Sequence, residues 1–117
     1  MAGKNGKFEF SEFTVEPQVL EEIAWLAASR VDGVAQMAAG GIAGRLKKKG
    51  VSGVTATSGD DHIDVEVHLV ASYGRPLKEL AREVQAAVKE SIESMVGGQV
   101  SLVDVFVDGI VFPERTQ

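Results

Sequence analysis

The segment that most constrains this chain is a strict alternation of side chains over residues 62–73, HIDVEVHLVASY. Apolar or small residues occupy every second position from Ile63 to Tyr73. The positions between them begin with the polar residues His62, Asp64, Glu66 and His68. Because successive side chains of a strand point to opposite faces, one face packs and the other meets water. The pattern predicts the central strand of a sheet that is covered on one side only.

Two helices are predicted to supply that cover. The first begins at Pro17, since proline suits the first helical position, and ends at Asp32-Gly33, where glycine suits a left-handed cap. The second runs from Pro76 to Val96 and stops at Gly97-Gly98. Both carry apolar residues at steps of three and four, which is helical spacing. The expected stripes are Val19, Leu20, Ile23, Leu26, Ala27 and Val31, and then Leu77, Leu80, Ala81, Val84, Val88, Ile92 and Met95.

Further strands are expected over residues 7–14, 51–58 and 100–107, and residues 34–37 have the character of a short strand. The main order is then strand, helix, strand, strand, helix, strand. This order predicts an α+β fold, a two-layer sandwich in which a mixed sheet carries two helices on one face. We expect one domain over residues 7–113, with disordered residues 1–6 before it and a tail at 114–117.

Composition excludes several classes of function. The chain has 117 residues, no cysteine and a net charge of −5. The lack of cysteine excludes disulfides, thiolate catalysis and cysteine-ligated metals. The negative charge disfavours nucleic acid as a partner. No apolar run reaches the roughly 18 residues that span a bilayer, and the first residues lack the apolar core of a secretory signal, so we expect a cytoplasmic protein.

The sequence offers few candidate catalytic groups. The glycine-rich segment 40–50 lacks the lysine and hydroxyl residue of a phosphate-binding loop, because Arg45 and Leu46 follow Gly44. The carboxylate pair Asp60-Asp61 is expected in a turn and the pair Glu21-Glu22 on a helix surface. We therefore expect no enzyme, cofactor or metal. The alternative is a small metal-dependent enzyme using His62, Asp64, Glu66 and His68, of which two neighbours could chelate one ion.

Exposed apolar side chains are the stronger signal. On the last strand, alternation turns Val103, Val105 and Val107 to the core and turns Leu102, Asp104, Phe106 and Asp108 outward. Leu102, Phe106 and Val70 on the central strand then form a candidate association surface, unless the N-terminal residues or segment 38–50 cover them. Trp25 lies off the stripe of its helix. It either packs under the N-terminal strand or a loop, or serves as an exposed anchor for a partner.

A basic run stands out in this acidic chain. Its cations are Arg45, Lys47, Lys48 and Lys49. The plain interpretation is a solvated loop. The alternative is a contact for an acidic partner or for anionic lipid headgroups, near which each cation contributes about 1 kcal/mol. Because no aromatic residues lie among the cations, the run is a weak signal for nucleic-acid binding.

Four segments in order carry a resemblance to a known family. They are EPQVLEEIAWLAASRVDGV (16–34), GV (50–51), IDVEVHLVASYGRPLKELAREVQAAVKESIESMVG (63–97) and VSLVDVFVDGIVF (100–112). The chain resembles the alkaline shock protein family of bacterial envelope stress response proteins. The most specific parts are VDGV at the end of the first helix, the Tyr73-Gly74 turn, the helix from Gln85 to Met95 and the closing VDVFVDGIVF. Segment 38–50 matches least well.

The resemblance implies a protein without catalytic residues. Such proteins are abundant in the cytoplasm and gather near the membrane, often through a membrane-anchored partner, and some are linked to the regulation of fatty-acid synthesis. We therefore expect a non-catalytic scaffold or interaction protein of the envelope stress response. It would form homo-oligomers or dock onto a membrane-anchored partner.

Overall fold

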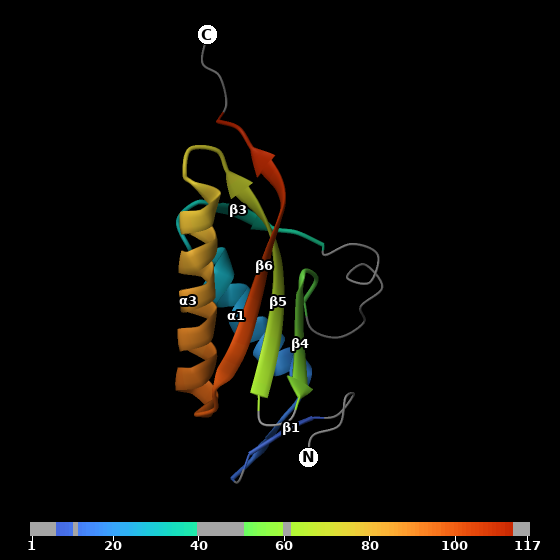
Figure 1. Ribbon diagram of the computed structural model, residues 1–117. Helices are drawn as coiled ribbons and strands as arrows, with labels where there is room; N and C mark the ends of the chain where they lie inside the picture. Colours follow the sequence, from blue (N-terminus) through green and yellow to red (C-terminus); the bar gives the residue numbers. More distant parts are fainter. Residues whose placement is uncertain (1–6, 11, 40–50, 60–61, 114–117) are drawn as a thin grey trace.

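The computed structural model describes residues 7–10, 12–39, 51–59 and 62–113. Its elements are β1 (Phe8–Glu9), β2 (Thr14–Val15), α1 (Pro17–Ser29), β3 (Val34–Met37), β4 (Val54–Gly59), β5 (His62–Ser72), α3 (Leu77–Val96) and β6 (Val100–Val111). This is the predicted α+β fold (Figure 1). The two predicted tails, the turn Asp60-Asp61 and the basic residues Arg45, Lys47, Lys48 and Lys49 lie outside the described residues.

Strand β5 is the centre of the sheet, as its alternation predicted. It pairs antiparallel with β4 along its first half and with β3 near its end, so these two strands share one edge of β5. On its other edge it pairs in parallel with β6. The end of β3 and the start of β4 meet beside His68 of β5. The His68 carbonyl accepts a hydrogen bond from the N–H of Ala38, just after β3, at 3.0 Å, and the His68 N–H donates to the carbonyl of Gly53, just before β4, at 2.7 Å. The predicted mixed sheet is confirmed.

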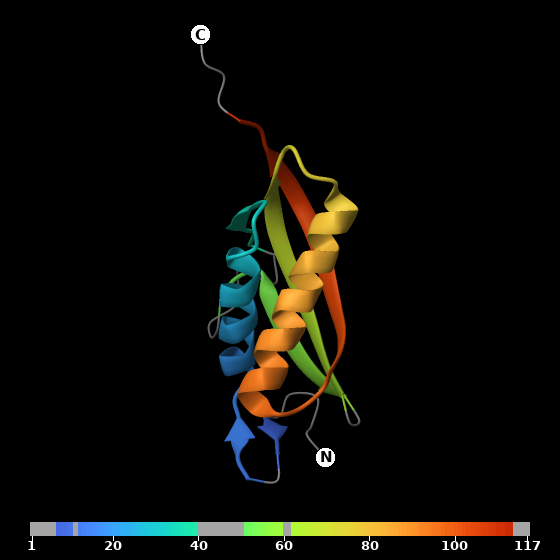
Figure 2. The same ribbon diagram turned by 90° about the vertical axis from the view of Figure 1, so that its left-hand side faces the viewer.

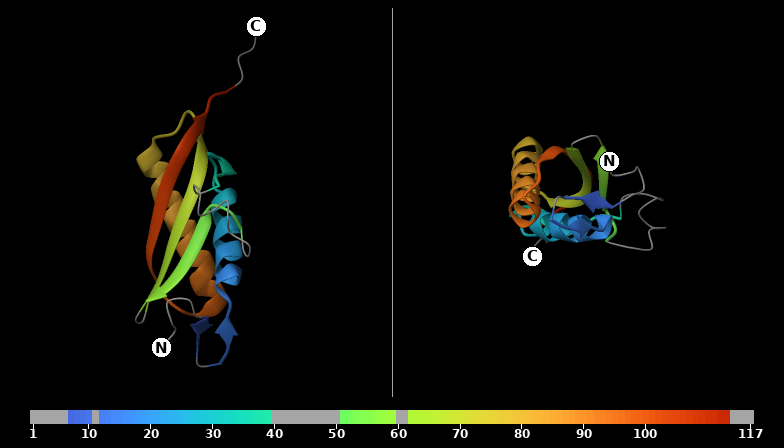
Figure 3. Two further views of the ribbon diagram at one scale, coloured as in Figure 1. Left: turned by 90° about the vertical axis from the view of Figure 1, so that its right-hand side faces the viewer. Right: turned by 90° about the horizontal axis from the view of Figure 1, so that it is seen from below.

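Helices α1 and α3 lie side by side on one face of this sheet (Figures 2 and 3). The β5 residues on that face are all buried: Ile63, Val65, Val67, Leu69 and Ala71. The helices meet them with Leu20, Ala24, Ala28, Leu80, Val84, Val88 and Ile92. The core is therefore a single apolar layer between the helices and the sheet, and no helix of the described residues lies on the other face of the sheet.

The predicted helix stripes are partly wrong. On α1, Val19 and Leu26 are exposed, while the small residues Ala24 and Ala28 are fully buried. Alanines at this contact let the helix backbone approach its neighbours closely, so the buried side of α1 is rotated from the predicted one. On α3, Met95 is 67% exposed and Val96 is buried. Leu77, at the start of the same helix, is also exposed.

The N-terminal prediction is wrong in its topology. Residues 7–14 do not form one strand of the main sheet, because β1 and β2 form their own two-stranded antiparallel sheet in which Phe8 pairs with Val15. This hairpin lies beyond the ends of the helices (Figure 1). Phe8 is 3% exposed and joins the core cluster. The hairpin therefore closes one end of the core instead of widening the sheet.

The other end of the sheet also departs from expectation. Strand β6 continues past residue 107 to Val111, with a register shift after Val107 that leaves Asp108 as an extra residue opposite β5. Tyr73 was expected in the core, yet β5 ends at Ser72 and Tyr73 is 63% exposed. Its ring packs on Phe112 with ring centroids 5.1 Å apart. Both aromatic rings are thus largely exposed.

Candidate functional site

The predicted apolar residues of the sheet lie on the face turned away from α1 and α3, which we call the open face (Figure 3, left). The β5–β6 register places Leu102 beside Asp64, and Phe106 beside His68. Leu102 is 48% exposed and Phe106 is 42% exposed, so neither is covered by the described residues. Val70 is half-buried on the same face.

The predicted interface residues do not form one patch. Phe106 and Val70 are diagonal neighbours, since Phe106 pairs with His68 two positions before Val70. Leu102 lies four residues before Phe106, about 13 Å along the strand. Trp25 belongs to α1 on the opposite side of the sheet. The open face therefore holds three of the four predicted residues, and Trp25 lies elsewhere.

An ionic cluster lies at the centre of the open face. The Nε2 atom of His68 lies 2.7 Å from Glu66 Oε2, and its Nδ1 atom lies 3.0 Å from Asp108 Oδ2. The Phe106 ring stacks on the imidazole with centroids 4.5 Å apart and an angle of 8° between the planes. The His68 side chain is only 15% exposed. Two carboxylates and one aromatic ring thus enclose this histidine.

The environment of His68 favours its charged form. Burial is the largest single influence and lowers the pKa of His68, but the hydrogen bonds to Glu66 and Asp108, together with the charges of those carboxylates, outweigh it. The pKa of His68 is therefore raised above its usual value of 6.5. As an imidazolium the ring donates through both nitrogens, one to each carboxylate.

Sequence reasoning missed this cluster. Asp108 is 40 residues from His68 in the chain, and it comes within hydrogen-bond distance through the parallel pairing of β5 with β6 and the extra residue after Val107. The alternation of each strand predicted that both side chains face outward. Only the register between the strands brings them together, and the sequence alone does not supply that register.

The residues of the proposed metal site do not act as one group. The Nε2 atom of His62 lies 3.4 Å from Asp64 Oδ2, whereas His68 pairs with Glu66 and Asp108. Both ring nitrogens of His68 are already taken up by carboxylates on opposite sides of the ring. Within the described part of the chain, no three histidine or carboxylate side chains are arranged to hold a metal ion.

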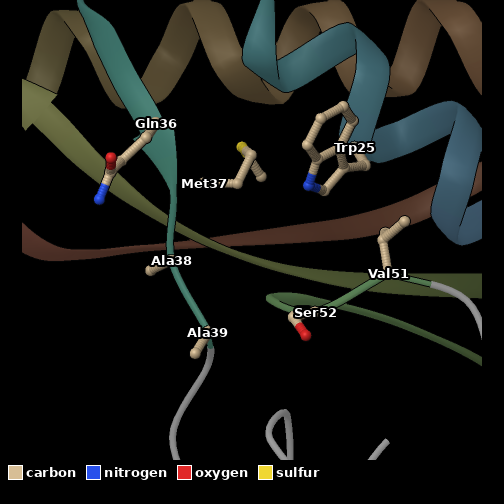
Figure 4. A pocket seen from close by; sticks show the side chains of 7 residues that line it. All are labelled: Trp25, Gln36, Met37, Ala38, Ala39, Val51 and Ser52. Atoms are coloured by element: carbon tan, nitrogen blue, oxygen red, sulfur yellow. The ribbon is translucent and has the colours of Figure 1, made fainter. Parts of the chain in front are cut away.

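Trp25 borders a hollow of about 580 Å³ on the side of the molecule where β3 ends (Figure 4). Its indole ring faces Met37 of β3. The other residues that line the hollow are Gln36, Ala38, Ala39, Val51 and Ser52. Trp25 is half-buried and packs against the core, and both of its predicted roles stay predictions.

One carboxylate of α1 was assigned to the wrong environment. Glu21 was expected on the helix surface, yet it is 5% exposed, and its Oε2 atom accepts a hydrogen bond from the Ala56 N–H at 2.9 Å. The rotation of α1 described above turns this residue toward β4. Its carboxylate satisfies a backbone donor of that strand, which is a structural role.

Comparison with known proteins places the chain in a family. A family model described as having a cell envelope-related function matches residues 6–112, nearly the whole chain. The chain belongs to the alkaline shock protein 23 family. This confirms the resemblance carried by the four sequence segments, and it shows a cell-envelope-related function for the family to which the chain belongs.

Two relatives of this family member show how far the similarity extends. It is 30% identical to the uncharacterized protein YqhY of Bacillus subtilis (strain 168) over 107 residues, covering 88% of this chain and 79% of YqhY. It is also 30% identical to the uncharacterized protein Spy1614 of Streptococcus pyogenes serotype M6 (strain ATCC BAA-946 / MGAS10394) over 113 residues, covering 92% of this chain and 89% of Spy1614.

Among solved structures, the copper form of the MamM CTD is similar to this alkaline shock protein 23 family member. The TM-score is 0.50 at 14% identity, with 86% of this chain and 92% of the MamM chain covered. At so low an identity the likeness shows the fold alone.

Proposed function

We propose that this protein is a non-catalytic interaction protein of the bacterial cell envelope, which associates with itself or docks onto a membrane-anchored partner from the cytoplasm. The observation that carries the proposal is the open face, where Leu102 and Phe106 are each more than 40% exposed on a rigid sheet. The family's cell-envelope-related function supports the setting.

A partner that covers Leu102 and Phe106 would stabilise the complex by removing their apolar surface from water. Burying exposed apolar surface contributes about 25 cal/mol per Å², and aromatic side chains are common anchors of protein interfaces. Leu102 and Phe106 are held by a strand paired along its length with β5, so they lose little freedom on binding. Neither helix of the described residues is long and apolar enough to cross a membrane.

The test is affinity capture from detergent-solubilised cells, together with light scattering of the purified protein at several concentrations. The variant carries Leu102→Asp and Phe106→Asp. We expect the unmodified protein to form oligomers or to capture a membrane protein, and the double variant to lose that association, because two buried carboxylates would oppose it.

A matched control is Leu26→Asp on α1, since Leu26 is 45% exposed on the helix layer. This variant should associate as the unmodified protein does. The proposal would be wrong if the unmodified protein were a strict monomer that captures no membrane protein, or if the double variant associated normally.

A further inference from the structure

We propose that the open face receives a cationic, partly apolar segment of the membrane-anchored partner, in which lysine or arginine alternates with apolar side chains. This inference rests on the proposed function and names the chemistry of the partner. It starts from the distribution of charge over the sheet.

The four strands of the main sheet contain no lysine or arginine. Their carboxylates all belong to the two long strands, and they are Asp64, Glu66, Asp104 and Asp108. The cations of the described residues lie on the hairpin, the helices and the turns, at Lys7, Arg30, Arg75, Lys78, Arg82 and Lys89. The carboxylates therefore give the sheet an excess of negative charge.

The positive charge that His68 contributes does not cancel this sign at the surface. The His68 side chain is 15% exposed, while the side chains of Glu66 and Asp108 are 48% and 37% exposed. Asp104 is exposed as well. A molecule that approaches the open face thus meets carboxylates, with the histidine behind them.

Apolar and acidic side chains alternate along β6. Leu102, Asp104, Phe106 and Asp108 point outward in turn, about 6.6 Å apart. A complementary segment has apolar groups to cover Leu102 and Phe106, and has cations alternating with them to pair with Asp104 and Asp108. This pattern is the basis for requiring both properties in the partner.

Charge complementarity also decides against other occupants. Two copies packed through this face would bring like charges together, and lipid phosphates or nucleic acid would be repelled. Membrane-spanning segments are flanked on the cytoplasmic side by an excess of lysine and arginine. A membrane-anchored partner therefore offers the required chemistry next to its anchor.

The test uses labelled synthetic peptides of about ten residues, which in extended form span the roughly 20 Å from Leu102 to Asp108, and the full-length protein. In the first peptide leucine and lysine alternate at every second position with threonine between them, so that both lie on one face. In one control serine replaces leucine, and in the other glutamate replaces lysine. Fluorescence anisotropy would be measured at about 0.05 and 0.3 M salt, where charge attraction is screened to different extents. We expect the lysine–leucine peptide to bind about tenfold more tightly than either control.

Two single variants locate the binding. Asp104→Lys reverses a charge on the open face and should weaken binding of the lysine–leucine peptide about tenfold. Glu90→Lys makes the same change in net charge at an exposed position on α3. It should change the affinity less than about twofold, since α3 lies on the other side of the sheet.

Three outcomes would overturn the inference. They are equal binding of the lysine–leucine and lysine–serine peptides, equal loss of affinity in the Asp104→Lys and Glu90→Lys variants, and a homo-oligomer that Asp104→Lys converts to monomers. If the inference fails in the first two ways while capture of a membrane protein still depends on Leu102 and Phe106, the proposed function stands. If the unmodified protein is a strict monomer and captures no membrane protein, both the inference and the proposed function fail.

Discussion

At the scale of single residues, His68 connects the fold to the chemistry of the open face. Its imidazolium form joins Glu66 on its own strand to Asp108 on β6. Because the pKa of His68 is raised in the folded protein, folding favours binding of a proton to this side chain. The resulting stabilisation is fully present below the pKa of His68 in the unfolded chain, and it is lost as pH rises through the raised pKa of the folded state.

This direction of the pH dependence leads to a prediction for His68→Gln. We expect the free energy of unfolding of the unmodified protein to fall as pH rises above 6.5, the usual pKa of His68, and through the raised value. In the glutamine variant this part of the fall should be absent, so the two stabilities converge at alkaline pH. Urea denaturation at a series of pH values measures the difference. Parallel curves for the two proteins would show that the contact has no net effect on the pKa of His68.

At the scale of elements, the meeting of β3 and β4 beside β5 depends on one glycine. Gly53 has φ of +88°, a conformation that residues with a side chain rarely adopt. A Cβ atom at this position would lie 2.0 Å from the Ala38 carbonyl oxygen. That oxygen belongs to the backbone that bonds to His68 at the end of β3. Close approach of two backbones, and not only the turn, requires glycine here.

We therefore expect Gly53→Ala to destabilise the fold by about 2 kcal/mol or more, from the strained φ and the contact with Ala38. Gly109→Ala is the matched control on the other edge of β5. The nearest atoms to a Cβ atom there belong to Val70 and are 3.9 Å away. Denaturant midpoints of the two variants make the comparison. Equal midpoints would mean that the β3–β4 junction rearranges without cost.

The elements also show how much of the fold can be predicted from the sequence. The alternation of residues 62–72 predicted β5 because burial on one face has a period of two. Pro17 and Gly97 predicted helix ends, since each meets a backbone requirement within its own turn. The rotation of α1 was not predictable. Apolar residues on neighbouring sides of this helix give almost equal stripes, and packing of Ala24 and Ala28 decides between them.

The candidate site, like the fold, could be predicted from the sequence only in part. The outward direction of Leu102 and Phe106 follows from alternation, and the structure has both exposed. The enclosure of His68 by Asp108 depends on strand register and on an extra residue in β6, which no local pattern records. The burial of Glu21 depends on a hydrogen bond to Ala56, 35 residues away. Long-range contacts thus account for what the sequence left open.

At the scale of the whole molecule, the layer that stabilises the fold is separate from the surface proposed to bind. The buried core lies between the helices and the sheet, whereas Leu102 and Phe106 lie outside it. A change on the open face should therefore affect association much more than folding. This separation follows because both helices of the described residues lie on the same face of the sheet.

We expect the Leu102→Asp, Phe106→Asp variant to remain folded, with a free energy of unfolding within about 1 kcal/mol of the unmodified protein, as is usual for exposed positions. The packing of Phe106 on His68 is the main contact that the variant loses. Circular dichroism and urea denaturation make the measurement. Gross unfolding of the double variant would show that these side chains support the core as well.

The parallel pairing of β5 with β6 has a consequence for synthesis. Ile63 pairs with Val100, so β6 reaches its place only after the whole of α3 has been made. Leu102, Asp104, Phe106 and Asp108 all belong to this late strand. While the ribosome is still translating α3, the growing polypeptide has no completed docking surface to offer, and recognition of a partner must wait until the last strand has emerged and been inserted beside its neighbour.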